Sequence, residues 1–158
     1  MPTVGRLMVW LNMNSQYPQT VVECLDPSRK YKPAVLRAVR AFGRAKPWTG
    51  TIAERQAKFR ELNVALSAAY GVEPPKLVFG SNPERDSGSS CYIPALNAII
   101  LHGYSVVSYL HEFAHFLFGR SERKACAWSL NLFRRCFPRS WTRLRFEGHM
   151  VRAERREA

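Results

Sequence analysis

From Pro33 onward the spacing of apolar positions changes twice, and these changes divide the 158-residue chain into predicted elements. Helical spacing follows Pro33, which suits the first turn of a helix because its missing N–H has no partner there. A second helix begins after Thr51, which can form a capping box with Glu54, and it stops at Gly71. The apolar stripes of the two helices consist of Val35, Ala38, Val39 and Phe42, and of Phe59, Leu62, Leu66 and Ala69.

Short apolar runs replace the helical spacing between residues 76 and 101. Lys76–Phe79 is predicted to be a strand, and Ser81–Ser90 has the Ser, Gly, Pro, Asn and Asp content of a loop. The runs Ser90–Ile93 and Ala98–Leu101 flank Pro94–Asn97, and this arrangement predicts a hairpin. Two earlier runs, Leu7–Leu11 and Thr20–Val22, are compatible with short strands, but residues 1–32 remain poorly defined.

Helical spacing returns at Ser105 and predicts a buried helix that ends at Gly119. Ser121 is a suitable cap for a further helix from about Glu122 to Phe137, which Pro138 halts. The inward stripe of that helix consists of Cys126, Leu130, Phe133 and Phe137. We therefore predict a single α+β domain over residues 1–158, with N-terminal helices, a small antiparallel or mixed sheet, two C-terminal helices and a frayed basic tail at 150–158.

Composition limits the class of protein. Hydrophobic residues make up 46% of the chain and charged residues 23%, which is ordinary for a globular domain. No apolar run approaches the roughly 18 residues that span a bilayer, and residues 1–10 lack the pattern of a signal peptide. We expect a cytoplasmic protein whose four scattered cysteines are reduced and mostly buried.

The net charge of +12 changes the picture, because such a surface attracts polyanions. The excess is dispersed along the chain, which weakens the case for a dedicated nucleic-acid site. Arg37, Arg40 and Arg44 share a helix face that is interpreted as solvated in preference to phosphate-binding. The Arg-rich segment 134–145 is interleaved with aromatic residues, for which burial in the core is the favoured interpretation.

The motif His111-Glu112-x-x-His115 lies on the predicted buried helix. Residues four apart on a helix share one face, so both imidazoles can reach a single Zn²⁺ at about 2.0–2.1 Å. Glu112 can then take a proton from a zinc-bound water and deliver it to the leaving group. The competing interpretation is two histidines without a metal, because a motif this short also arises by chance.

Glu122 is the candidate for the third ligand of one zinc ion per chain. It lies four residues before Cys126 on the inward stripe, and a carboxylate on a buried face needs a cation. The alternative is that it only favours the start of its helix electrostatically. His149 is a reserve ligand and His102 a weaker one, whereas Cys126 is better explained as a buried thiol.

At these residues the chain resembles the zincin metallopeptidases, and more loosely the ImmA/IrrE and SprT-like branches. The similar stretch runs from about Gly88 to Phe137 and contains the hairpin, the HExxH helix and a helix beginning Glu122-x-x-Ala125. The resemblance implies a gluzincin-like ligand set completed by Glu122. One feature departs from ImmA/IrrE proteins, because only six residues separate His115 from Glu122, a spacing closer to the Gly-turn style of metzincins.

The resemblance also implies how a substrate binds. The strand Ala98–Leu101 is expected to offer its free edge to an extended peptide. Tyr92, Tyr104 or His149 is a candidate to assist in polarising the scissile carbonyl. The leading hypothesis is accordingly an intracellular zinc endopeptidase, and the alternative is a nucleic-acid-associated module that keeps zinc for structure. Substrate, specificity and oligomeric state stay undetermined.

Overall fold

The computed structural model describes residues 21–80, 90–147 and 150–153. The predicted strand Leu7–Leu11 and His149 lie outside these residues. Helix α2 spans Val21–Cys24, so the strand predicted at Thr20–Val22 is wrong for this part. A distant helix contacts the end of α2, because the Asn131 side chain accepts from the Asp26 N–H at 2.7 Å and donates to the Cys24 carbonyl.

Two helices follow as predicted. Helix α3 spans Pro33–Arg44 and buries Val35, Val39 and Phe42, while its three arginines stay exposed. Helix α4 spans Ile52–Ala69, and the Thr51 hydroxyl accepts from the Glu54 N–H at 3.2 Å, which satisfies one free donor at the helix start. Gly71 follows the helix with a φ of 64°, the left-handed conformation that glycine adopts without strain.

Three strands form a mixed sheet in the order β1-β3-β2. Strand β3 (Ala98–Leu101) pairs in parallel with β1 (Lys76–Phe79) and antiparallel with β2 (Cys91–Ile93). The short helix η1 (Pro94–Leu96) and the left-handed Asn97 turn the predicted hairpin. The sheet buries one face, with Ile99 and Leu101 inaccessible, whereas Val78 on the other face is 46% exposed.

Helix α5 spans Val106–Phe118 and helix α6 spans Glu122–Cys136. Serine hydroxyls begin both, since Ser105 accepts from the Ser108 N–H and Ser121 from the Lys124 N–H. After α6 come α7 (Pro138–Trp141) and a hairpin of β4 (Leu144–Glu147) and β5 (Met150–Ala153) that the sequence analysis missed. Residues 150–153, assigned to a frayed tail, are therefore a strand.

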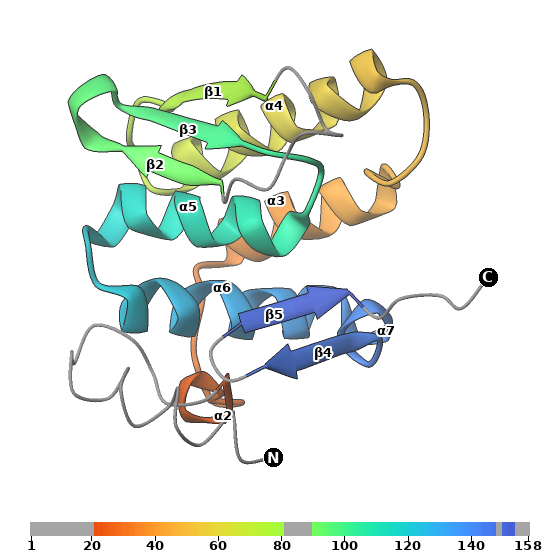
Figure 1. The fold of residues 1–158 in the computed structure, drawn as a ribbon, viewed down its shortest axis with the longest axis vertical. Helices are drawn as coiled ribbons and strands as arrows, with labels where there is room; N and C mark the ends of the chain where they lie inside the picture. The colour runs from red at the N-terminus through yellow and green to blue at the C-terminus, as the bar shows by residue number, and fades with distance from the viewer. Residues whose placement is uncertain (1–20, 81–89, 148–149, 154–158) are drawn as a thin grey trace.

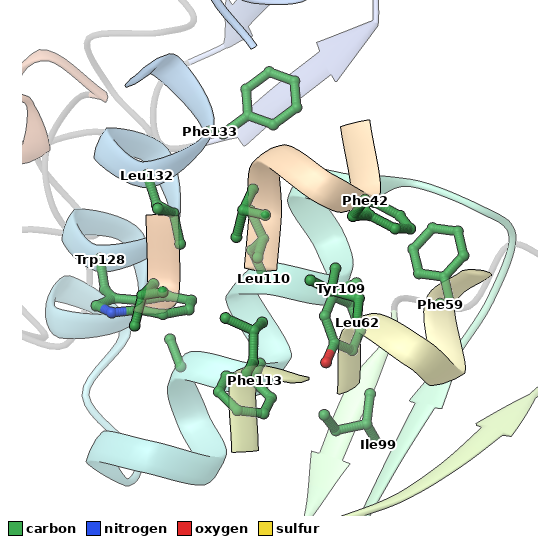
Figure 2. Packing of buried hydrophobic residues seen from close by; sticks show 14 of the residues in the cluster. Phe42, Phe59, Leu62, Ile99, Tyr109, Leu110, Phe113, Trp128, Leu132 and Phe133 are labelled. Carbon is green, nitrogen blue, oxygen red and sulfur yellow. The ribbon is translucent and has the colours of Figure 1, made fainter. Parts of the chain in front are cut away.

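The core lies between these layers. In Figure 1 helix α5 runs between the sheet and α6, with α2, α7 and the β4–β5 hairpin beyond α6. Trp128 of α6 packs on Phe113 of α5 with ring centroids 5.9 Å apart, and Phe59 of α4 meets Tyr109 of α5 at 5.8 Å (Figure 2). Because α5 is enclosed by the sheet on one side and α6 on another, it buries more than the predicted stripe, including Tyr109 and Glu112.

No helix in the described ranges has the length and apolar character that crossing a membrane requires.

Candidate metal centre

The second half of α5 and the start of α6 bring the candidate ligands together. His111 and His115 lie one turn apart on α5, and their rings are 4.8 Å apart between centroids. Gly119 ends α5 with a φ of 86°, a conformation that other residues rarely adopt, and the chain reverses there. Ser121 then begins α6 so that Glu122, its first residue, faces the two imidazoles.

The ligand atoms of these three residues converge on one point. Glu122 Oε2 lies 2.9 Å from His111 Nε2, and Glu122 Oε1 lies 3.0 Å from His115 Nε2. The two Nε2 atoms are 3.1 Å apart. All are atoms that coordinate metal ions, and the three residues form a His-His-Glu group that could hold one.

The spacing suits a tetrahedral zinc ion. Ligands at about 2.05 Å from a tetrahedral metal lie roughly 3.3 Å from one another. The two Nε2 atoms are 3.1 Å apart, and each lies 2.9 or 3.0 Å from a different carboxylate oxygen of Glu122, so all these distances are close to that value. The residues present therefore fit a metal ion of this size.

The second nitrogen of each imidazole is also occupied, and this fixes which nitrogen faces the centre. His115 Nδ1 donates to the Gly119 carbonyl at 2.8 Å, leaving the Nε2 lone pair directed at the other ligands. His111 Nδ1 lies 3.9 Å from the Sγ of Cys126. Cys126 thus lies on the far side of the His111 ring from the converging atoms, where it can orient the ring without sharing its metal.

The charges of the centre depend on one another. The Glu122 carboxylate raises the pKa of His115 to about 9, against the opposing effect of burial. Burial acts to raise the pKa of Glu122, but hydrogen bonds with His111 and His115 outweigh it and hold that pKa at about 2. Converging electron pairs repel one another, so a cation stabilises the group: a proton in the metal-free protein, or a metal ion.

Glu112 is buried beside the centre, with 8% of its surface exposed. Burial raises the pKa of its carboxyl, while the neighbouring His111 and His115 and a hydrogen bond from the Tyr92 backbone act in the opposite direction. Its side chain lines the same cleft as His115 and Glu122. A titratable group in this position can exchange a proton with a molecule bound in the cleft.

A cleft of about 500 Å³ opens at the centre. One wall is strand β2 with the Ser90 that precedes it, and the other is formed by the C-terminal half of α5 and the turn after it. Arg120, which the sequence analysis did not select, lines the cleft with an exposed side chain. Its position in the predicted turn between His115 and Glu122 is the sequence feature that could have identified Arg120 as a cleft residue.

The strand expected to receive a substrate is not an edge strand. Ala98–Leu101 lies at the centre of the sheet and pairs on both sides. The predicted hairpin accounts for one side, and β1 pairs with the other, which the sequence analysis expected to be free. Within the described ranges the strand with an unpaired edge beside the cleft is β2, and the Tyr92 N–H on it is directed at Glu112. The expectation that β3 has a free edge was therefore wrong.

The remaining candidates lie at or away from the centre as follows. Tyr92 lines the cleft, but its hydroxyl donates to Asn97 Oδ1 at 2.8 Å. Tyr104 packs on Phe59 and accepts from Gln56, outside the cleft. His102 is not part of the His-His-Glu group.

Comparisons with known proteins place the chain in no family. No family model matches it, and no curated protein and no solved structure matches it either. The functional interpretation therefore depends on the site itself.

Proposed function

We propose that this chain is a zinc-dependent metallohydrolase of the zincin type that cleaves peptide bonds. His111, His115 and Glu122 would hold the ion, and Glu112 would serve as general base and then general acid. The observation that carries the proposal is the convergence of three metal-binding side chains within 3.1 Å of one another, at the wall of an open cleft. Two imidazoles with one carboxylate is a donor set typical of catalytic zinc.

The protein residues divide the chemistry between them. A bound zinc ion supplies Lewis acidity, which makes water acidic and polarises a carbonyl group. Glu112 would accept the proton released by the attacking water, and its burial keeps bulk water from competing for that proton. It would then pass the proton to the nitrogen of the scissile bond, because this nitrogen must be protonated to leave as an amine.

Catalysis is favoured over a purely structural role by the number of ligands. Structural zinc sites are closed by four protein ligands, whereas catalytic sites keep one position open. Among the described residues the group contains three members, and Cys126 contacts the opposite nitrogen of His111. Two members of the group, His115 and Glu122, line the cleft that Glu112 also lines, so a position left open on the ion would be accessible from this cleft.

A peptide is the substrate class that the cleft suits best. An extended backbone can hydrogen-bond to the unpaired edge of β2, as an added strand does at any exposed sheet edge. This would place a peptide bond between β2 and the ligands of α5. Arg120 at the other wall is available to a carbonyl or carboxylate group of the same peptide.

The alternative is a zinc-containing nucleic-acid-associated module without turnover. The net charge of +12 favours it, but a structural site has no use for a buried carboxylate beside an open coordination position. Glu112 is therefore the residue that separates the two functions.

Substituting Glu112→Gln tests the proposal. The zinc-loaded variant should bind one zinc ion per chain as the wild type does, yet lose hydrolysis of a mixed peptide library by at least 100-fold. Glu73→Gln, which changes an exposed glutamate between α4 and β1, is the matched control and should retain activity. Zinc-loaded wild-type protein that cleaves no peptide in the library, or an E112Q variant with unchanged activity, would overturn the proposal.

A further inference from the structure

A second hollow lies at the opposite end of α6 from the metal centre. It has a volume of about 460 Å³ and lies where the C-terminal half of α3 meets the junction of α6 and α7. Glu122 begins α6 and Cys136 ends it, so the two sites are separated by about 20 Å of helix. The residues of the hollow are Arg40, Gly43, Arg44, Trp48, Cys136 and Phe137, with the first three residues of α7.

The hollow is rich in positive charge. Arg40 and Arg44 of α3 and Arg139 of α7 line it with exposed side chains, and no acidic residue lines it. In the part of the chain that the structure describes, the ion pairs involve other residues. Arg44 also suits the C-terminal end of α3 electrostatically. That explains one arginine but not the approach of three like charges from two elements far apart in the sequence.

An exposed aromatic ring completes the hollow. Trp48 follows α3 and leaves 57% of its surface exposed, which is unusual for the largest apolar side chain. Phe137 reaches the base of the hollow because residue 43 is glycine: a Cβ there would lie 3.0 Å from the Phe137 ring. The hollow thus combines an accessible indole face with three guanidinium groups.

We propose that this hollow binds single-stranded nucleic acid, with a base stacked on Trp48 and neighbouring phosphates at Arg40, Arg44 and Arg139. Stacking surfaces within a basic groove are the means by which proteins bind single strands without reading sequence. A duplex hides the faces of its bases, and the carboxylates of an acidic peptide carry no ring that could stack on the indole. The net charge of +12 adds long-range attraction for a polyanion of this kind.

Fluorescence anisotropy of a labelled 20-nucleotide oligothymidylate tests the proposal with the full 158-residue chain. Trp48→Ala should weaken binding at least fivefold, the lower end of the effect of losing one stacked base, and Trp48→Phe should restore most of it. Arg40→Ala and Arg139→Ala should each weaken binding and reduce the salt slope by about 0.7. Arg37→Ala is the matched control, because Arg37 is exposed on the same helix but does not line the hollow, and it should stay within twofold of wild type.

These variants distinguish binding of the oligonucleotide in the hollow from nonspecific attraction to the positive charge of the whole surface. Equal losses for Arg37→Ala and Arg40→Ala would overturn the proposal, as would no measurable binding in 50 mM salt. Tighter binding to the duplex of the same length would also overturn it. Displacement of the oligonucleotide by free thymidine monophosphate or polyglutamate at equal monomer concentration would assign the hollow to another ligand.

Discussion

The metal-free centre should make the stability of the protein depend on pH in a specific direction. Glu122 raises the pKa of His115 from its ordinary 6.5 to about 9. A group that binds its proton more tightly when folded stabilises the fold below its unfolded pKa, and loses that contribution as pH rises through the folded pKa. The stabilisation from this pair is therefore fully present below pH 6.5 and is lost as the pH rises through about 9.

The magnitude follows from the size of the shift. Raising the pKa of His115 from 6.5 to about 9 corresponds to at most roughly 3.4 kcal/mol, at 1.36 kcal/mol per pKa unit. The side chains of His115 and Glu122 are only 12% and 23% exposed, so screening by solvent reduces this value moderately. We therefore expect the interaction of His115 with Glu122 to stabilise the folded protein by roughly 1–3 kcal/mol.

Urea unfolding of chelator-treated protein between pH 6.5 and 9.5 measures the effect. Other groups titrate in this range, so the informative quantity is the difference between wild type and Glu122→Gln. That difference in unfolding free energy should shrink by roughly 1–3 kcal/mol as the pH rises from 6.5 to 9.5. Parallel pH profiles for the two proteins would refute the assignment of the His115 shift to Glu122.

Three further outcomes follow from the site. Cys126→Ala should weaken zinc binding about 10-fold in a competition titration, since it removes the neighbour of His111 Nδ1; unchanged affinity would deny Cys126 this role. Gly119→Ala should destabilise the fold by about 1–3 kcal/mol, because a φ of 86° with a ψ of −154° strains any residue with a Cβ; an unaltered urea midpoint would contradict this. Arg120→Ala should raise the KM for peptides more than it lowers kcat, and an effect on kcat alone would exclude a binding role.

Local signals in the sequence predict most of the helices and the convergence of His111, His115 and Glu122. The caps at Thr51, Ser105 and Ser121 mark three helix starts because each serine or threonine hydroxyl satisfies a free N–H nearby. The spacing of His111 and His115 with the inward position of Glu122 was enough to predict that the three meet. All of these inferences depend on residues close together in the chain.

Long-range pairing could not be predicted in the same way. Nothing in the run Lys76–Phe79 indicates that it pairs in parallel with β3, and this pairing moves the free edge beside the cleft from β3 to β2. The β4–β5 hairpin was missed because its alternation is short and rich in arginine. Likewise, Arg139 joins Arg40 only through the packing of α6 on α3.

The central claim is that two imidazoles and one carboxylate hold a single zinc ion. Zinc-edge X-ray absorption on the 158-residue protein, replenished with zinc and then dialysed, identifies the ligand atoms, and the zinc content of the same sample gives the stoichiometry. We expect one zinc per chain with nitrogen and oxygen ligands and no sulfur, and a marked loss of zinc in Glu122→Ala. Protein without bound zinc, or a zinc ion coordinated by sulfur, would contradict it.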